Sequence, residues 1–271
     1  MKIARVEYQG DVYPALVTCS GYQLDLSLGA DDTSYNSQAA GMVVSADDVT
    51  LLPPVLPGKI LGVGWNFREH VAEMTDRRAS GEEVVHVAAP GELPPFLVFM
   101  KPPSSLIGHG DAIVYPKEAT KVEYEGELAV VISRTIRRVT PEEARTAVLG
   151  WTCANDVTER NLQAGDGQWW RAKGYDTFAV AGPFLETEPP SSDAWIRTRV
   201  NGRLCQEGQI LAMFRDPYVI ISLLSQAMTL QRGDLIMLGT PPGVGPLQPG
   251  DVVEVEIDGV GYLKNHVVAE D

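Results

Sequence analysis

The sequence predicts a strand-rich α+β fold in two unequal parts, a small N-terminal β domain over residues 1–57 and a larger domain over residues 58–271. Many short apolar runs separated by turn residues, with few helical patterns, favour this class. The length allows one large domain or two unequal ones, because 271 residues exceed the roughly 150 of an average domain. The segment Pro53-Pro54-Val55-Leu56-Pro57-Gly58 suits neither a helix nor a central strand, and we place the boundary there.

The N-terminal part is predicted to consist of short strands. Residues rich in β-branched and aromatic side chains alternate with the turn signals Gln9-Gly10 and Ser20-Gly21. The expected strands cover residues 4–8, 12–19 and 23–28. After the boundary we expect a strand at residues 59–63, one or two helical turns at 67–74, and a long polar connection at 75–95. A connection of that length is a candidate lid.

The middle of the chain has its strongest strand signal at residues 122–133, which a strand at 96–100 precedes. Thr140-Pro141-Glu142-Glu143 combines an N-cap Thr, a Pro at the first helical position and a Glu three residues after the cap. This pattern is typical of a helix start, and we expect the helix to continue through residue 149. The elements expected next are a strand at 151–157, a helix at 158–163, and a strand at 177–185 bounded by Gly182-Pro183.

The C-terminal third is predicted to contain two β-hairpins and one helix. The dipeptides Asn201-Gly202 and Asp258-Gly259 are typical hairpin turns. They would join strands at 196–200 and 203–206, and at 252–257 and 261–268. Asp216-Pro217 supplies a cap and a first-position Pro for a helix that runs to residue 228, and a further strand is expected at 235–238.

Acidic residues dominate the composition, since 36 Asp and Glu against 22 Lys and Arg give a formal charge of −14. A negative field repels phosphate backbones and anionic headgroups, so we expect neither nucleic acid nor membrane as a partner. The three cysteines lie far apart without a CxxC pair, which indicates a reducing compartment and buried thiols. No signal-peptide core and no apolar run of ~20 residues is present, so the expected location is cytoplasmic.

Three carboxylates alternate along the strand at residues 122–133, so Glu123, Glu125 and Glu127 would share one face. For an arbitrary Glu-x-Glu, a solvent-facing edge strand is the more common situation. Here an apolar run at 128–132 follows directly, and a buried acidic pair favours a hard cation. Asp156, at the end of the next strand, would be a third ligand or the N-cap of the following helix. Oxygen ligands without Cys or clustered His favour Mg²⁺, Mn²⁺ or Ca²⁺ over zinc.

His70 and Glu73 stand three positions apart in a predicted helix, which places their side chains within hydrogen-bonding reach. Such a pair can act as a base, although an exposed helical pair without a function is the commoner alternative. The turn at 239–245 is no nucleotide-binding motif, but its N–H groups and the Thr240 hydroxyl could face a carboxylate. Lys173 and Arg160 are candidate cations for an anionic substrate, and each alone is more often a surface residue.

A series of segments, in this order, resembles the fumarylacetoacetate hydrolase family. The segments are GVGWNFREHVAEM, FMKPPSSLIG, YEGELAVVI, NDVTERNLQ, KGYDTFAVAGP, VNGRLCQEG and LGTPPGVG, and the resemblance extends from residue 59 to the C-terminus. It implies a mixed β-roll catalytic domain behind a small N-terminal β domain, usually in a homodimer, with Mg²⁺ or Mn²⁺ bound by three carboxylates. Carried over by motif, the ligands are Glu125, Glu127 and Asp156, and Glu123 is not a ligand.

The same resemblance implies roles for other residues. His70 and Glu73 match a His–Glu dyad that hydrolases and decarboxylases of the family carry and that members which only isomerise or hydrate often lack. Arg160, Gln163, Lys173 and Thr240 fall on positions that contact substrate. We count Lys173 as catalytic with the dyad, because its charge would offset the charge that develops during the reaction.

We therefore expect a divalent-metal-dependent hydrolase that cleaves a C–C bond in an acylpyruvate, fumarylpyruvate or fumarylacetoacetate-like 2-oxo acid. The substrate would chelate the cation, which stabilises an enolate, while His70 and Glu73 activate water. The alternatives are an oxaloacetate-type decarboxylase, an isomerase or hydratase of 2-hydroxymuconate-type aromatic catabolites, and a non-catalytic binding protein. A small anionic substrate also requires a locally positive pocket, which the metal, Lys173 and Arg160 would provide.

Overall fold

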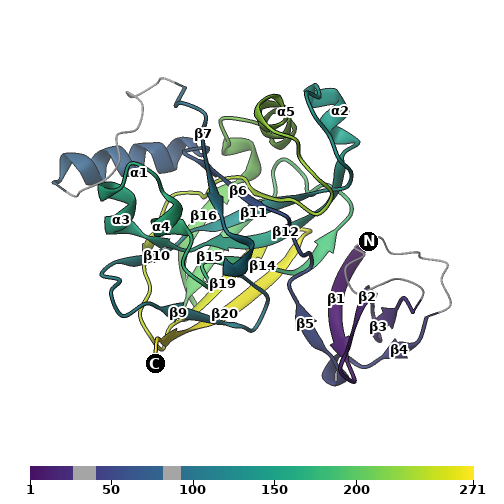
Figure 1. Cartoon of the computed structure of the whole chain (residues 1–271). Helices are drawn as coiled ribbons and strands as arrows, with labels where there is room; N and C mark the ends of the chain where they lie inside the picture. The colour runs from purple at the N-terminus through teal and green to yellow at the C-terminus, as the bar shows by residue number, and fades with distance from the viewer. Residues whose placement is uncertain (27–40, 82–92) are drawn as a thin grey trace.

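Figure 1 shows the computed structural model of the chain, which describes residues 1–26, 41–81 and 93–271. The α-helices are α1 (Arg68–Ala79), α2 (Pro141–Arg145), α3 (Arg160–Gly165), α4 (Trp170–Lys173) and α5 (Pro217–Ala227). The strands before α2 are β1 (Lys2–Tyr8), β2 (Asp11–Thr18), β3 (Gly21–Leu24), β4 (Val43–Val44), β5 (Thr50–Leu52), β6 (Ile60–Gly64), β7 (Leu97–Lys101), β8 (Leu106–Ile107), β9 (Ala112–Tyr115), β10 (Val122–Tyr124) and β11 (Gly126–Ile132). The later strands are β12 (Val148–Asp156), β13 (Thr158–Glu159), β14 (Ala179–Glu186), β15 (Trp195–Val200), β16 (Arg203–Gln209), β17 (Leu235–Met237), β18 (Gly245–Pro246), β19 (Val252–Ile257) and β20 (Gly261–Ala269). The predicted strand-rich α+β class is confirmed.

The described strands form three sheets. A twelve-stranded sheet runs β4-β3-β2-β1-β14-β12-β11-β17-β6-β7, with β5 beside β1 and β8 beside β14. A second sheet runs β13-β10-β18, and a third runs β16-β15-β19-β20-β9. Strand β11 is central to the large sheet, because it pairs antiparallel with both β12 and β17. The ends of these three strands meet at one place, and they carry the polar residues of the site.

The N-terminal strands have an apolar cluster of their own. Its buried residues come from the first 44 residues of the chain: Ala4, Val6, Ala15, Tyr22, Leu24 and Val44. Figure 1 shows these strands, in purple, to one side of the larger body of the fold. Strand β1 joins the large sheet through two residue pairs with β14, Lys2↔Glu186 and Ile3↔Leu185. Phe184 of β14 also packs against this cluster, so the two parts are in contact, and the division at residues 57 and 58 stays a prediction.

Strand β11 is buried on both faces, as its unbroken apolar sequence predicts. Leu128, Val130 and Ile132 belong to the main core, which also includes the packed faces of the third sheet and of α5. Ala129 and Val131 point the other way into a second cluster. Alternate side chains of one strand therefore enter two cores, and the backbone of β11 is held rigidly where the site begins.

Several local predictions are confirmed. Thr140 caps α2 in a complete capping box with Glu143, and the Asp216 side chain accepts a hydrogen bond at the start of α5 from the N–H of Tyr218 at 2.8 Å. Asn201 and Gly202 both have positive φ, at 53° and 77°, between paired β15 and β16. A two-residue hairpin turn of this type requires a left-handed backbone at both positions, which Asn and Gly tolerate. The hairpin of β19 and β20 around Asp258-Gly259 is also present.

Four predicted boundaries are wrong. The strand expected at 122–133 is interrupted at Glu125, so β10 and β11 belong to different sheets. The helix expected to reach residue 149 ends at Arg145, because residues from Val148 onward pair with β11 in the sheet. Thr158 and Glu159 form a short strand, and the following helix starts at Arg160. The strand expected to be bounded by Gly182-Pro183 passes through that dipeptide to Glu186.

The first helix is longer than predicted. Residues 75–79, expected in the connection, continue α1, and the Thr75 hydroxyl donates a hydrogen bond to the Val71 carbonyl at 2.8 Å. Polar residues fit there because one side of α1 faces solvent. Residues 82–92 of the expected connection and residues 27–28 of the expected third strand lie outside the described residues.

The thiols are free, but only Cys153 is buried, whereas Cys19 is exposed and Cys205 is partly exposed. Two of the three cysteines therefore depart from the expectation of buried thiols. Within the described ranges, no helix has the length and apolar character needed to cross a membrane.

Candidate active site

Three buried carboxylates converge where the ends of β10, β11 and β12 meet. Glu125 lies in the break between β10 and β11, Glu127 is the second residue of β11, and Asp156 ends β12. One carboxylate oxygen from each lies within 4.8 Å of the others. All three side chains are buried, so the solvent-facing alternative for Glu125 and Glu127 is excluded. Asp156 is not the cap of α3 either, because Glu159 holds that position.

Two of the three carboxylates are paired with cations. The Lys173 ammonium lies 2.6 Å from Glu125 Oε2 and 2.6 Å from Asp156 Oδ2, and the Arg160 guanidinium lies 2.6 Å from Glu125 Oε1. Burial acts to raise the pKa of Glu125, but the charges of Lys173 and Arg160 outweigh it and hold this pKa far below its ordinary value. The same carboxylates raise the pKa of Lys173, although burial opposes the shift. Glu125 and Lys173 are therefore both ionised.

The third carboxylate, Glu127, has no cationic side chain at salt-bridge distance among the described residues. It accepts a hydrogen bond from the Gly239 N–H, which lies 2.7 Å from Oε2. Burial, together with the charges of Asp156 and Glu125, raises its pKa well above the ordinary value. Glu127 is thus the member of the group whose charge is least compensated by the chain itself.

Lys101 is a further buried cation that the sequence reasoning missed. It ends β7, and its ammonium donates hydrogen bonds to three backbone carbonyls, those of Val157 at 3.1 Å, Lys173 at 2.6 Å and Phe178 at 2.8 Å. It also lies 2.7 Å from Asp156 Oδ1. Burial lowers its pKa to about 8, although Asp156 opposes the shift. The sequence signal that could have identified Lys101 is its position at the end of an apolar strand and directly before Pro102-Pro103.

His70 and Glu73 form the predicted pair on α1, with His70 Nδ1 3.0 Å from Glu73 Oε2. Glu73 also accepts a hydrogen bond from the Gly243 N–H, which lies 3.1 Å from each carboxylate oxygen. Val71 and Met74 pack the helix into an apolar cluster with Trp65 and Trp169. His70 is buried, so the alternative of an exposed helical pair is excluded.

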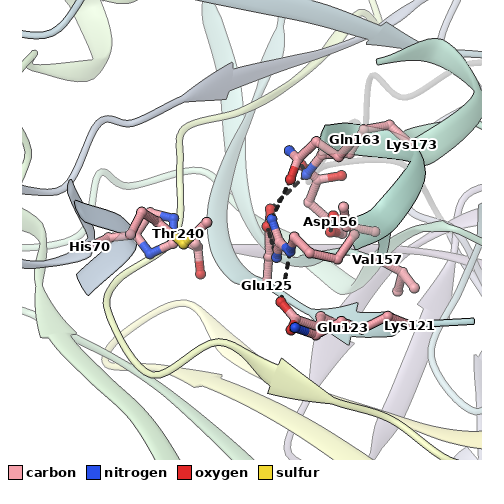
Figure 2. A network of polar contacts seen from close by, with 12 residues as sticks. His70, Lys121, Glu123, Glu125, Asp156, Val157, Gln163, Lys173 and Thr240 are labelled. Carbon is pink, nitrogen blue, oxygen red and sulfur yellow. Dashed lines mark hydrogen bonds and ion pairs between the residues drawn. The ribbon is translucent and has the colours of Figure 1, made fainter. Parts of the chain in front are cut away.

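His70 and the three carboxylates line one pocket, together with Arg160, Gln163, Lys173 and Thr240. Glu73 does not line the pocket but contacts His70 Nδ1, as described above. Figure 2 shows His70 and Thr240 on one side of Glu125, and Asp156, Gln163 and Lys173 on the other. The space between the lining side chains is about 20 Å³, which is room for about one water molecule. Eight of the nine residues predicted for the site line this pocket and the ninth contacts one of them, while their individual roles stay predictions.

Glu123 does not share the carboxylate group, contrary to the prediction from strand alternation. The interruption of the strand at Glu125 directs it elsewhere, and it accepts hydrogen bonds from Arg160 Nε at 2.7 Å and from Arg77 at 2.8 Å. Arg160 also donates a hydrogen bond to Gln163 Oε1. A single guanidinium thus connects Glu123, Glu125 and Gln163.

The turn after β17 binds carboxylates of the chain itself. Its Gly239 and Gly243 N–H groups donate to Glu127 and Glu73, as described above. The Thr240 hydroxyl donates to the Gly126 carbonyl at 2.9 Å and accepts from Gln206 Nε2 at 2.8 Å. The predicted use of the turn's N–H groups is therefore seen, but the hydroxyl is held by the backbone beside Glu127. Gln206, which also accepts from the Gly126 N–H at 3.0 Å, was missed.

Comparison with known proteins gives a consistent result. Residues 59–268 match the family model described as fumarylacetoacetate (FAA) hydrolase C-terminal. The chain is 34% identical to a 2,4-didehydro-3-deoxy-L-rhamnonate hydrolase from Sphingomonas sp. (strain SKA58), over 98% of this chain and 96% of that protein. It is 36% identical to an oxaloacetate tautomerase from Bacillus subtilis (strain 168), over 86% and 77% of the two chains.

Two solved structures are also similar over the full length of both chains. One is a 5-carboxymethyl-2-hydroxymuconate delta-isomerase from Mycobacterium smegmatis, with a TM-score of 0.85 and 34% identity. The other is a maleylpyruvate hydrolase from Sphingobium sp. SYK-6 in complex with manganese(II) and pyruvate, with a TM-score of 0.79 and 26% identity. Hydrolases, a tautomerase and an isomerase thus share this chain's sequence pattern and fold.

Proposed function

This chain belongs to the fumarylacetoacetate hydrolase family, and we propose that it is a divalent-metal-dependent hydrolase that cleaves a C–C bond in a 2-oxo acid. The observation that carries the proposal is that His70, paired with Glu73, lines the same pocket as three convergent buried carboxylates. The carboxylates would bind a metal, and the pair would supply a base.

The carboxylate group fits a hard divalent cation. All three donors are oxygens, they converge within 4.8 Å, and Glu127 lacks a cationic partner among the described residues. Such a set favours Mg²⁺ or Mn²⁺ over softer metals. The relative that binds manganese(II) and pyruvate supports the same choice. Held by Glu125, Glu127 and Asp156, the cation would supply a Lewis acid for the oxygens of the 2-oxo acid and for the negative charge that develops on cleavage.

The charges of the site support an anionic substrate. The described cluster contains four carboxylates, those of Glu123, Glu125, Glu127 and Asp156. Five cationic side chains lie within salt-bridge distance of them, those of Arg77, Lys101, Lys121, Arg160 and Lys173. The carboxylates are therefore already compensated, and a bound divalent cation adds an excess of positive charge in a buried place. The carboxylate of a 2-oxo acid would offset part of that excess.

The dyad would act as the base. With Nδ1 bonded to Glu73, the His70 ring keeps Nε2 for a proton from water, and the carboxylate stabilises the imidazolium that results. The water oxygen would attack the distal carbonyl carbon, and the C–C bond would break with its electron pair remaining on the 2-oxo acid fragment. Protonation of that fragment by His70 would release a 2-oxo acid and a second carboxylic acid. Lys173 and Arg160, held at the carboxylates, would orient the substrate's anionic groups.

Keto–enol isomerisation is the second candidate. Proton transfer by His70 would be sufficient for this reaction, which requires no attacking water. The similarity to an oxaloacetate tautomerase supports it. Both reactions would use the same dyad and the same metal, and hydrolysis adds the attack of water and the cleavage of the C–C bond.

The test is a Mn²⁺-dependent assay on acetylpyruvate, fumarylpyruvate and oxaloacetate, followed by proton NMR. Hydrolysis releases pyruvate with acetate or fumarate, decarboxylation of oxaloacetate releases pyruvate with CO₂, and isomerisation only speeds the approach to the keto–enol equilibrium. His70→Gln should lower kcat about a hundredfold or more and leave Mn²⁺ affinity intact. His266→Gln is the control, because His266 is exposed. The hydrolase proposal is wrong if no acid product forms from the acylpyruvates.

A further inference from the structure

Arg77, in the last turn of helix α1, contacts a carboxylate beside the proposed metal site. His70, Glu73 and Arg77 are spaced three and four positions apart, which places them on one face of the helix. Arg77 donates hydrogen bonds to both carboxylate oxygens of Glu123, at 2.8 and 3.4 Å. Glu123 is 1% exposed. This face of α1 is therefore held at two places. Glu73 is bound by the Gly243 N–H, and Arg77 is bound to Glu123.

The ion pair continues into the metal site. Glu123 also accepts from Arg160 Nε at 2.7 Å, and the same guanidinium lies 2.6 Å from Glu125 Oε1. Figure 2 shows Glu123 and Glu125 joined by dashed contacts along this line. Lys121 is a weaker partner, because its ammonium is 3.6 Å away and one-third exposed. Burial acts to raise the pKa of Glu123, but Arg160 and Arg77 hold it below the ordinary value, so the carboxylate is charged.

We propose that Glu123 is a positioning residue that latches α1, through Arg77, in the place that sets His70 over the three carboxylates. Among the described residues, α1 is also held by the apolar contacts of Val71 and Met74, by the hydrogen bond from the Gly243 N–H to Glu73, and by the Arg68 guanidinium over the Phe214 ring. None of these contacts connects the helix to the carboxylate site through an ion pair. The effect on turnover rests on the proposed function, whereas the attachment of the helix does not.

Access to the site gives the latch a physical role. His70 and Met74 of α1 line the pocket together with the three carboxylates, so movement of this helix would widen the pocket for a substrate. Movement of α1 away from the carboxylates separates Arg77 from Glu123. Return of the helix restores the pair and, with it, the position of His70. Arg160 would remain at Glu125 throughout, because it is buried and bound to Gln163 as well.

The experiment compares Arg77→Met with Arg78→Met, which removes the same charge from the exposed neighbour on the same helix. Hydrogen exchange of the α1 amides is measured by mass spectrometry in metal-free protein, and Mn²⁺ affinity and kcat are measured separately. We expect Arg77→Met to speed α1 exchange about tenfold, since a hydrogen bond to a charged group is lost. Its kcat should fall while its Mn²⁺ affinity stays within about twofold. Arg77→Lys should recover part of both losses, and Arg78→Met should match the wild type.

A double variant tests whether Arg77 acts through Glu123. Glu123→Gln keeps the shape of the side chain and removes its charge, so Arg77→Met should add little to it. Equal α1 exchange in Arg77→Met and Arg78→Met, or additive effects in the double variant, would overturn the latch. If Glu123→Gln does not fold, the comparison of the two arginine variants still decides. Failure of the proposed function would instead appear as no turnover of any 2-oxo acid by the wild type, with the exchange result unaffected.

Discussion

Lys101→Met should destabilise the protein strongly, because the Lys101 side chain is fully buried and its ammonium is bound on several sides. The ammonium serves three backbone carbonyls and lies beside Asp156. Methionine fills a similar volume but removes a donor from all three carbonyls, of which that of Phe178 keeps the Val157 N–H at 3.0 Å, and it leaves Asp156 without this cation. Removing one partner of a buried ion pair costs about 3–5 kcal/mol. Because whole domains are stable by about 5–15 kcal/mol, this one change would remove a large share of the free energy of unfolding.

The assay is urea unfolding followed by tryptophan fluorescence, in the presence of EDTA. In a thermal melt, a loss of that size corresponds to a fall in Tm of about 6–20 °C. Lys117→Met is the control, since Lys117 is exposed and should change the free energy of unfolding by less than about 0.5 kcal/mol. A Lys101→Met protein within about 1 kcal/mol of the control would refute the reasoning. Such a result would mean that the three carbonyls and Asp156 find other partners, or that the ion pair between Lys101 and Asp156 makes no net contribution to the free energy of unfolding.

Two further predictions concern the metal and the buried thiol. Mn²⁺ at a hundred times its Kd should raise the free energy of unfolding by about 2.7 kcal/mol. Glu127→Gln should abolish this gain in thermal melts and leave the stability in EDTA unchanged. A shift with Mn²⁺ that survives the substitution would contradict the assigned ligand set. Burial raises the pKa of Cys153 to about 12, so its thiol stays protonated in the folded protein. A thiol reagent at pH 8 should therefore modify Cys19 in the native protein and Cys153 only in urea, as mapped by mass spectrometry. Modification of Cys153 in the native protein would contradict this prediction.

Local sequence determined much of the fold, because short-range physics acts within a few residues. Hairpin turns at Asn201-Gly202 and Asp258-Gly259, and helix caps at Thr140 and Asp216, need only their own side chains and backbone conformations. The ends of elements were less predictable. Strand pairing with β11 took residues from Val148 onward into the sheet, and no local pattern reveals that partner.

The candidate site was also identified in part from the sequence. The carboxylates of Glu125, Glu127 and Asp156 stood out because acidic residues beside buried strands are costly without a cation. The pair of His70 and Glu73 followed from helical spacing alone. These features depend on residue type and on spacing within one element, which a sequence displays directly.

Only the tertiary structure decided how charge is distributed among these groups. The interruption of the strand at Glu125 sent Glu123 to Arg77 and Arg160, and Lys101 entered from a strand 55 positions before Asp156 in the chain. Each of these contacts joins residues far apart in sequence, and its geometry depends on how several sheets pack. Electrostatic free energy varies with burial and with distances of a few ångströms. Sequence therefore supplied the ionisable groups, and folding chose their partners.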